Sequence, residues 1–406
     1  MAKPAGPRCN LRCAYCYYLP KAARFPLAAP WRMDVELLES FIRQRLEISP
    51  GPVTHFEWHG GEPTLLGLQF FRLAVDLQRR HAPAEREISN GLQTNGLLLD
   101  PEWIEFLARE KFSVGLSLDG PPEHHDAYRR DGGDQATHRG VSRTLRRLQT
   151  ARIPFDILCV LHDENTRDPG ILLRFFRELG IKSLQFLPLV DPDPGSPRGV
   201  GPRTAPPEIL GEFLCQVFDD WIAHDLGAIG VQFFEEALRP FLGLPHALCV
   251  FRKTCGEVLV LEHNGDVFTC DHFVDDARWL GNLRQTSLLE ITRSPALDRF
   301  GQDKFDTLPD CCRGCDVLEF CHGGCPKDRI ISTPDGQPGL SYLCPAYKKF
   351  FRHARSTLQR LAFHITARLP LSQFKDKPAA AVSRSVGPNA LCPCGSSRKY
   401  KKCCRK

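Results

Sequence analysis

Short β-rich apolar runs alternate with longer amphipathic runs between about residue 50 and residue 190. The short runs have the length and the residue types of strands, and the longer runs have the three- to four-residue periodicity of helices. We expect strands at residues 53–58, 87–93, 113–118, 155–161 and 183–187, and helices at residues 65–80, 101–109, 138–151 and 168–179. This alternation predicts an α/β fold whose βα units form a parallel sheet or partial barrel, with functional loops at the strand carboxyl ends.

The pattern of residue types changes after this region. A stretch rich in Pro and Gly (191–207) precedes helical periodicity that continues to about residue 242. Residues 249–344 hold nine cysteines and little long periodic structure, as expected where metal clusters replace part of a hydrophobic core. A helix is expected at about 346–369. The predicted organisation is a barrel domain (1–240), a Cys-rich domain with its C-terminal helix (241–370), a linker (371–387) and a Cys-rich tail (388–406).

Composition favours a globular enzyme, because 406 residues with 42 % apolar content can fill a sizeable core. No apolar run approaches membrane-spanning length and the N-terminus lacks a secretory pattern, so we expect a cytoplasmic protein with no membrane partner.

The net charge of +5 is a property of the tail, which carries Arg398, Lys399, Lys401, Lys402, Arg405 and Lys406. The rest of the chain has a net charge of −1, so nucleic acid is not an expected partner of the main body.

Eighteen cysteines in a reducing compartment are better explained as metal ligands or catalytic groups than as disulfides. Most of them are clustered in the sequence. Cys159 and Cys215 stand alone in apolar stretches, where buried structural thiols are expected.

Three cysteines near the start of the chain, Cys9, Cys13 and Cys16, have the spacing CxxxCxxC. Three thiolates leave one iron of a four-iron cluster open to a further ligand, as catalytic metal sites require. The alternatives are a zinc site with a distant fourth ligand, or unconnected thiols.

This loop, with Tyr15 before its third cysteine, resembles the signature of the radical S-adenosylmethionine (SAM) superfamily, which has a partial (β/α)6 barrel. The resemblance implies that the open iron binds SAM and that an electron cleaves its S–C bond to give a 5′-deoxyadenosyl radical. It also implies cosubstrate contacts from Tyr15 and from loops after the predicted strands: Gly60, Gly61, Glu62, Pro63, Thr94, Asn95, Ser117, Asp119 and Arg129. Taken alone, Gly-Gly-Glu-Pro, Asn-Gly and Asp-Gly are also ordinary turn sequences.

Eight of the later cysteines suffice for two complete four-ligand clusters. Their spacing resembles the SPASM extension of peptide-modifying radical enzymes, which carries two auxiliary 4Fe-4S clusters. The resemblance assigns Cys249, Cys255, Cys270 and Cys325 to one cluster, and Cys312, Cys315, Cys321 and Cys344 to the other. Cys312 is preferred to Cys311 because it preserves the x2 spacing, and zinc ribbons are the alternative.

Within this superfamily the chain resembles the anaerobic sulfatase-maturating enzymes over about residues 1–350. The matching segments are Lys3-Pro4, Tyr17-Tyr18-Leu19, residues 58–65 and Cys270-Asp271-His272-Phe273-Val274. Relatives usually carry several residues before the Lys-Pro pair, so the first strand is expected to be short unless the true start lies upstream.

The resemblance implies a function: oxidation of a Cys or Ser in a sulfatase segment of the form Cys/Ser-x-Pro-x-Arg to formylglycine. Asp271 is then the expected base, and Tyr18 is expected to position the substrate. The alternative for Asp271 is a surface carboxylate in a turn, since Asn264-Gly265-Asp266 upstream favours a hairpin. The implied electron source is a low-potential donor such as flavodoxin or ferredoxin.

The tail has the spacing C-x-C-x8-C-C, in which Cys392, Cys394, Cys403 and Cys404 form a self-contained zinc site. It resembles the SEC-C motif. The tail cations are expected to dock on an acidic protein face or RNA, or to serve only for solubility.

The expected cofactors are thus SAM, three 4Fe-4S clusters and one zinc ion. Two other functions stay open from the sequence: a SPASM maturase that forms thioether or other crosslinks in a ribosomal peptide, and an iron–sulfur electron carrier. The three-ligand loop speaks against the carrier, because carriers saturate their clusters.

Overall fold

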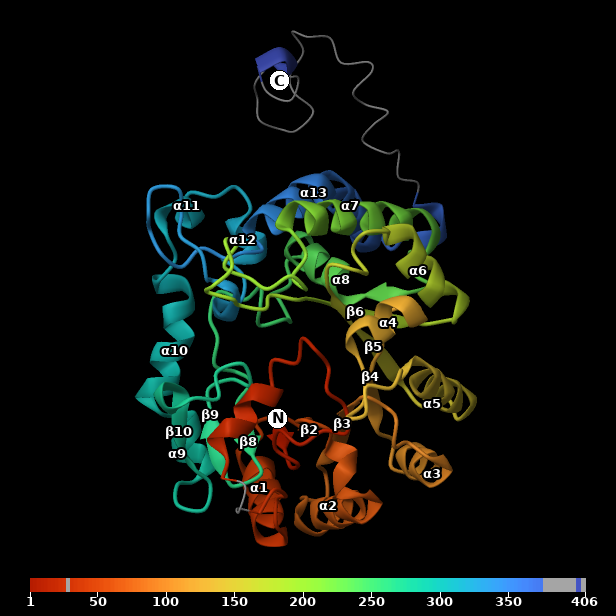
Figure 1. Ribbon diagram of the computed structural model, residues 1–406, viewed down its shortest axis with the longest axis vertical. Coiled ribbons are helices and arrows are strands. Elements are labelled where there is room, and N and C mark those ends of the chain that lie inside the picture. Colours follow the sequence, from red (N-terminus) through yellow and green to blue (C-terminus); the bar gives the residue numbers. More distant parts are fainter. Residues whose placement is uncertain (27–29, 375–398, 403–406) are drawn as a thin grey trace.

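The computed structural model describes residues 1–26, 30–374 and 399–402, and a single mixed sheet runs through them (Figure 1). Its strands are β1 (Ala2–Lys3), β2 (Val53–Trp58), β3 (Glu87–Thr94), β4 (Ser113–Ser117), β5 (Phe155–Leu161), β6 (Ser183–Pro188), β7 (Gly230–Val231), β8 (Val260–Glu262), β9 (Asp266–Phe268) and β10 (Trp279–Asn282). The order across the sheet is β10-β9-β8-β1-β2-β3-β4-β5-β6-β7. Strands β1 to β7 are all parallel, which makes them the partial (β/α) barrel.

Helices connect the parallel strands and cover the outer face of the curved sheet (Figure 1). They are α1 (Val35–Ile48), α2 (Leu68–His81), α3 (Pro101–Arg109), α4 (Pro122–Tyr128), α5 (His138–Thr150), α6 (Pro169–Glu178) and α7 (Pro207–His224). Local chemistry fixes several of their starts: before α3, the side chain of Asp100 accepts a hydrogen bond from the Trp103 N–H (3.0 Å), and Pro101 takes the first helical position.

The barrel core is aromatic where β2 meets the helices outside it. Trp58 and Phe56 stack at 6.2 Å, and the edge of Phe71 from α2 meets the Trp58 ring. Cys159 and Cys215 are both buried, as predicted for structural thiols. The buried face of each strand thus fixes the register of that strand. As a result, the loops that follow the parallel strands lie at the same edge of the sheet.

The sheet continues past the predicted domain boundary at residue 240. Strand β8 is parallel to β1, and β9 and β10 add antiparallel pairs beyond it. The predicted hairpin at Asn264-Gly265-Asp266 is confirmed as the turn between β8 and β9, where Gly265 has a φ of +98°. The boundaries of the four predicted segments otherwise stay predictions.

The remaining helices surround the Cys-rich region. They are α8 (Gln232–Leu238), α9 (Leu288–Thr292), α10 (Pro295–Asp306), α11 (Asp310–Arg313), α12 (Leu318–Cys321) and α13 (Cys344–Thr366). Helix α13 packs on α7 and α8 through Phe350, whose ring lies 5.7 Å from Phe218 and 5.6 Å from Phe234. Across the described ranges, no helix is both long enough and apolar enough to cross a membrane.

One sequence-based expectation about secondary structure was wrong, and several helices were not predicted. Helix α1 was not predicted, and neither was α10 within the Cys-rich region. The segment after residue 207 is not one helical run, because β7 separates α7 from α8. A two-residue strand has no periodicity to detect, and its pairing with β6 becomes visible only in the folded sheet.

Candidate active site

The cysteine loop, residues 9–16, follows β1 and lies against the segment after α4. The Arg12 N–H donates to the Arg130 carbonyl (2.8 Å), and the Ala14 N–H donates to the Tyr128 carbonyl (2.9 Å). The Sγ of Cys9 accepts a hydrogen bond from the Leu11 N–H at 3.3 Å. The loop is thus tied by its backbone to the barrel on both sides of Cys13.

The Gly-Gly-Glu-Pro segment after β2 packs directly on the chain that leads into this loop. The Gly61 N–H donates to the Gly6 carbonyl (2.7 Å), and the Glu62 N–H donates to the Arg8 carbonyl (2.8 Å). A Cβ atom at position 61 would lie 2.0 Å from the Arg8 carbonyl oxygen, and Gly60 has a φ of +136°. Both glycines are therefore required by close backbone approach, whatever contact they make with SAM.

Glu62 links the ends of β2 and β3 to the cysteine loop. Its buried carboxylate accepts hydrogen bonds from the Thr64 hydroxyl (2.6 Å), the Thr94 hydroxyl (2.8 Å) and the Asn95 N–H (2.8 Å). Asn95 in turn donates to the Asn10 side chain (2.8 Å). Burial raises the pKa of Glu62, and these hydrogen bonds oppose that shift.

Tyr15, Asp119 and Arg129 form a second connected group. The Tyr15 hydroxyl donates to Asp119 and accepts from Arg129 Nη1 at 3.0 Å. Asp119 also accepts from the Val160 N–H (2.9 Å). Ser117, at the end of β4, accepts from Gln93 (3.2 Å) and stays partly exposed. The structure therefore brings the predicted SAM contacts of β3 and β4 together around the cysteine loop.

The polar groups at this place suit an iron–sulfur cluster and SAM. Burial raises the pKa of Cys9 to about 12 and also raises that of Cys13, so these thiols need a cation before they become thiolates. The buried Nε of Arg129 and Nε2 of His162 have no hydrogen-bond partner among the described residues. Buried polar atoms left open around Tyr15 fit a polar ligand bound there.

Asp271 lies beside the cysteine loop, just after Cys270. Its side chain is 15 % exposed, accepts a hydrogen bond from the Tyr17 hydroxyl (2.6 Å), and forms an ion pair with Lys3 Nζ at 3.6 Å. Asp271 does lie in a turn, which the Phe273 N–H closes on the Cys270 carbonyl (3.1 Å), but its side chain is paired and largely buried and is not a free surface carboxylate. Its sequence neighbours place it after β9, but the Lys3 and Tyr17 partners come from the other end of the chain.

The structure separates the roles of the two tyrosines after Cys16. Tyr18 is 2 % exposed, donates its hydroxyl hydrogen bond to Glu262, and lies under the Lys3 ammonium, which is 3.5 Å from its ring centroid. Tyr17 is the tyrosine that contacts Asp271. Sequence reasoning missed Tyr17, Lys3 and Glu262, although the Lys-Pro and Tyr-Tyr pairs were visible as matching segments.

Charges around Asp271 favour its ionised form. Burial alone would raise the pKa of Asp271, but the Lys3 ammonium, together with the Tyr17 hydrogen bond, holds it well below its ordinary value. Burial lowers the pKa of His59 to about 3 and that of His272 to about 4, so both rings are neutral near pH 7. Asp271 is thus an ionised carboxylate flanked by neutral imidazoles.

The first set of auxiliary cysteines gathers in space from distant segments: Cys249, Cys255, Cys270 and Cys325. Burial raises the pKa of Cys270, and Cys325 and Cys249 lie close enough to raise it further. Burial likewise raises the pKa of Cys325 to about 12, with a smaller contribution from Cys255. These four thiols are thus close enough to influence one another electrostatically, and their role as one ligand set stays a prediction.

The second set of auxiliary cysteines, Cys312, Cys315, Cys321 and Cys344, gathers at α11, α12 and the start of α13. Burial raises the pKa of Cys312 to about 12 and that of Cys321 to about 11, and Cys344 contributes to both shifts. Cys312 is buried whereas Cys311 is exposed, which favours Cys312 as the ligand.

No three His, Cys, Asp or Glu side chains within the described ranges form a group that could hold a single metal ion. The predicted zinc ligands Cys392, Cys394, Cys403 and Cys404 lie outside the described residues.

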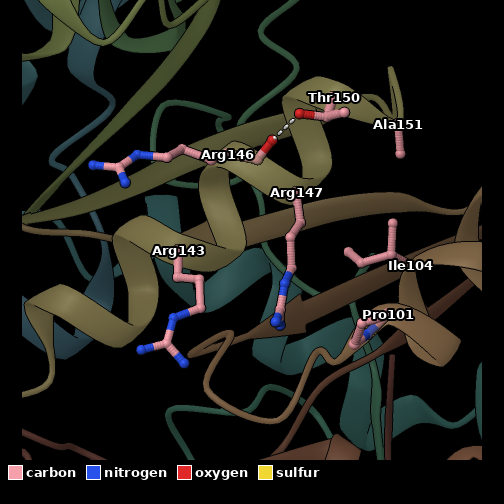
Figure 2. Close-up of a pocket in the computed structure, with 7 residues that line it drawn as sticks. All are labelled: Pro101, Ile104, Arg143, Arg146, Arg147, Thr150 and Ala151. Atoms are coloured by element: carbon pink, nitrogen blue, oxygen red, sulfur yellow. Dashed lines mark hydrogen bonds between the residues drawn. The ribbon is translucent and has the colours of Figure 1, made fainter.

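A groove on the outer helical layer is separate from the candidate site. It has a volume of about 410 Å³ between α3 and α5 and is lined by Pro101, Ile104, Arg143, Arg146, Arg147, Thr150 and Ala151 (Figure 2). None of these residues belongs to the groups described above. Arg143, Arg146 and Arg147 make this face locally basic. The net charge of the main body, which is −1, gives no sign of this local excess.

Comparison with known families agrees with the three predicted parts of the chain. Residues 4–176 match the Radical SAM superfamily, residues 249–316 match the SPASM iron–sulfur cluster-binding domain, and residues 389–406 match the SEC-C motif. The fold class predicted from the sequence is confirmed for the barrel and its Cys-rich extension.

Two relatives match most of the chain. It is 37 % identical to the serine-type anaerobic sulfatase-maturating enzyme of Bacteroides thetaiotaomicron, over 87 % of this chain and 88 % of that protein. It is 33 % identical to the cysteine-type anaerobic sulfatase-maturating enzyme of Clostridium perfringens, over 90 % of this chain and 98 % of that protein.

Solved structures give the same result. The fold is similar to native anSMEcpe with bound AdoMet and Kp18Cys peptide, with a TM-score of 0.81 and 33 % identity over 89 % of this chain and 98 % of that chain. Streptococcus suis SuiB bound to S-adenosylmethionine is similar in fold alone, with a TM-score of 0.58 and 17 % identity over 81 % of this chain and 73 % of that chain.

Proposed function

The chain belongs to the family of anaerobic sulfatase-maturating enzymes, and on that basis we propose that it oxidises a Cys or Ser side chain of a sulfatase to formylglycine. The substrate is a sulfatase polypeptide segment of the form Cys/Ser-x-Pro-x-Arg. As a radical SAM enzyme it is not an electron carrier.

One observation carries this proposal: the largely buried carboxylate of Asp271 lies beside the cysteine loop. The loop suits a cluster with an open iron, and Asp271 is fixed by Tyr17 and Lys3. A crosslinking peptide maturase is not favoured by any comparable feature, since the similarity to SuiB extends to the fold alone.

We assign the cofactor sites from the residues that gather in the structure. Cys9, Cys13 and Cys16 hold the catalytic cluster, and Tyr15, Glu62, Thr94, Asn95, Ser117, Asp119 and Arg129, with Gly60, Gly61 and Pro63, form the SAM site. When bound, the cluster and SAM supply reductive S–C cleavage and a carbon radical that abstracts hydrogen. The two auxiliary sets hold one 4Fe-4S cluster each, and the tail holds zinc.

The chain's own residues then complete the oxidation. Asp271 accepts the proton that the substrate side chain loses, the Tyr17 hydroxyl orients the carboxylate, and Lys3 keeps it charged. The Tyr18 ring packs against the Lys3 ammonium, and through this contact Tyr18 helps to position the substrate. A low-potential donor such as flavodoxin or ferredoxin provides electrons, and the reaction takes place in the cytoplasm, where free thiols persist.

Co-expression with a Cys-type and, separately, a Ser-type sulfatase tests the proposed function. Mass analysis of the sulfatase active-site peptide is expected to show formylglycine with at least one of the two, and none when the enzyme carries Cys13→Ala. A sulfatase peptide that stays unmodified in both experiments, with an iron-loaded enzyme present, would contradict the proposal.

Metal analysis tests the assigned sites. Eleven proposed iron ligands correspond to three four-iron clusters, so anaerobic reconstitution is expected to give about twelve irons per chain, with one zinc. About four irons would remove both auxiliary sites.

A further inference from the structure

Lys304 and Arg329 are cations of the Cys-rich region that pair with no carboxylate among the residues that the structure describes. Lys304 in α10 is 1 % exposed, and Arg329, which follows Cys325, is half-buried. In the part of the chain that the structure describes, neither side chain forms an ion pair. Burying a positive charge is unfavourable unless neighbouring groups stabilise it, so the groups that surround these two cations matter.

Lys304 is bound by backbone carbonyls that surround the first auxiliary set. Its ammonium donates to the carbonyls of Cys249, Val250 (3.1 Å) and Arg252. All three carbonyls belong to the segment that carries the predicted ligand Cys249. Lys304 therefore holds this segment against α10.

Arg329 holds the turn that connects one auxiliary set to the other. The carbonyls of His322, Gly323 and Gly324 accept from its guanidinium at 3.1, 3.1 and 3.4 Å. These three residues lie between Cys321 of the second set and Cys325 of the first. They have φ values of 42°, 73° and 66°, an unusual left-handed run that turns their carbonyls toward the guanidinium.

The two cations are also joined to each other. Arg329 Nη1 donates to the Lys304 backbone carbonyl at 2.6 Å. A Cβ atom at position 323 would lie 2.9 Å from Arg329 Nη2, so the glycine leaves room for the guanidinium. We call this unit, Lys304 and Arg329 with the carbonyls they bind, the cationic bracket.

Thiols of both sets lie within electrostatic reach of the bracket. Burial lowers the pKa of Arg329, and thiolates of Cys312 and Cys321 from the second set, and of Cys255 and Cys325 from the first, oppose that shift. Burial also lowers the pKa of Lys304, and Cys255, Cys325 and Cys249 oppose it. Thiolate-ligated clusters held by these cysteines would lie next to both cations, and such clusters carry negative charge and gain more on reduction.

We propose that the cationic bracket raises the reduction potentials of the auxiliary clusters and fixes the turn between them, so that electrons leaving the substrate can be accepted there. This rests on the proposed function, because the clusters are its assigned cofactors. A positive charge stabilises the more negative, reduced form of a cluster, and the low dielectric around Lys304 strengthens the effect. The bracket residues are positioning residues, since they touch neither substrate nor SAM.

The test is a redox titration followed by electron paramagnetic resonance in the full-length chain carrying Cys9→Ala, Cys13→Ala and Cys16→Ala, which reports the auxiliary clusters alone. Lys304→Met and Arg329→Met are expected to lower at least one auxiliary potential by a tenfold change in the oxidised-to-reduced ratio, about 59 mV for one electron. Arg329→Lys keeps the charge and is expected to stay near the parent potential. Lys253→Met is the matched control, because Lys253 is an exposed lysine two residues from Cys255.

Parent-like potentials in Lys304→Met and Arg329→Met, with about eight irons bound, would overturn the proposal. If both variants lose auxiliary iron while Arg329→Lys and Lys253→Met keep it, the requirement for charge is supported. If Arg329→Lys loses iron as Arg329→Met does, the role is structural and the proposal fails. Failure of the proposed function is distinct, since a parent chain without auxiliary iron would show it before any bracket variant is made.

Discussion

The cysteine loop at residues 9–16 and the Cys-rich region at residues 249–344 are built by different means. The loop takes its three thiols from eight consecutive residues and is tied by backbone hydrogen bonds to a regular sheet. The Cys-rich region takes eight predicted ligands from segments up to 95 residues apart, on short helices and turns that two cations hold together. In the proposed assignment the loop leaves an iron open for chemistry, whereas each auxiliary set ligates its cluster fully and suits electron transfer.

The comparison also shows where the two regions meet. Cys270 belongs to the first auxiliary set, yet the next residue, Asp271, faces the cysteine loop and contacts Tyr17 and Lys3. The β8–β9 hairpin that leads to Cys270 pairs with β1, so the sheet itself places Asp271 beside the cysteine loop. The proposed sites of proton removal and electron acceptance are thus adjacent because one sheet crosses both regions.

The largest expected effect comes from the cysteine loop. Cys13→Ala removes one of three ligands to the catalytic cluster, so both 5′-deoxyadenosine and formylglycine are expected to disappear. Chromatography of the nucleoside products and mass analysis of a substrate peptide measure this. Cys215→Ala, which alters a buried thiol away from the clusters, is the control and is expected to keep both products.

The next effect separates the two regions at Asp271. Asp271→Asn is expected to form 5′-deoxyadenosine but to lower formylglycine by a factor on the order of 10² or more, because the variant cannot accept the substrate proton. Asp275→Asn, an exposed neighbour in the same loop, is expected to behave as the parent. Wild-type peptide turnover by a cluster-replete Asp271→Asn chain would remove the base assignment.

A smaller effect distinguishes the tyrosines. Tyr17→Phe deletes a hydrogen bond to the charged Asp271 and is expected to lower formylglycine formation about tenfold. Tyr18→Phe leaves the buried Glu262 without its donor and is expected to lower stability by about 1–3 kcal/mol, measured as a lower thermal midpoint of the loaded enzyme. Equal effects of both substitutions on turnover would mean that Tyr17 has no special role in orienting the base.

The smallest effect is expected from the tail. Truncation after Phe374 keeps Leu371 and Phe374, which pack on the core, and removes the predicted linker and zinc site. Turnover of a short substrate peptide is expected to stay unchanged, because the tail has its own ligands. Loss of peptide turnover in a folded, cluster-replete truncation would show that the tail takes part in the chemistry.

Much of the barrel could be predicted from the sequence because its signals are local. The periodicity of residues 53–58 and 155–161 gives β2 and β5 with their bounds, and Asp100-Pro101 gives the start of α3. The ligands Cys9, Cys13 and Cys16 are recognisable for the same reason, since eight residues hold the whole motif.

Long-range contacts could not be predicted in this way. Lys3 reaches Asp271 across 268 positions of the sequence, and Tyr18 reaches Glu262 across 244, so no local pattern records either contact. Lys304 and Arg329 look like ordinary surface cations in the sequence, and only folding removes them from water and from carboxylates. The sequence analysis thus missed the contacts between polar side chains that lie far apart in the chain, because only the tertiary fold decides which of them pair.

The most direct test of the account is a hydrogen-tracing experiment. The reconstituted enzyme is incubated with SAM, a reductant and a Cys-x-Pro-x-Arg or Ser-x-Pro-x-Arg peptide deuterated at Cβ of the target residue. Deuterium is expected in the 5′-deoxyadenosine, together with formylglycine in the same peptide. Unlabelled 5′-deoxyadenosine with an unmodified or crosslinked peptide would contradict it.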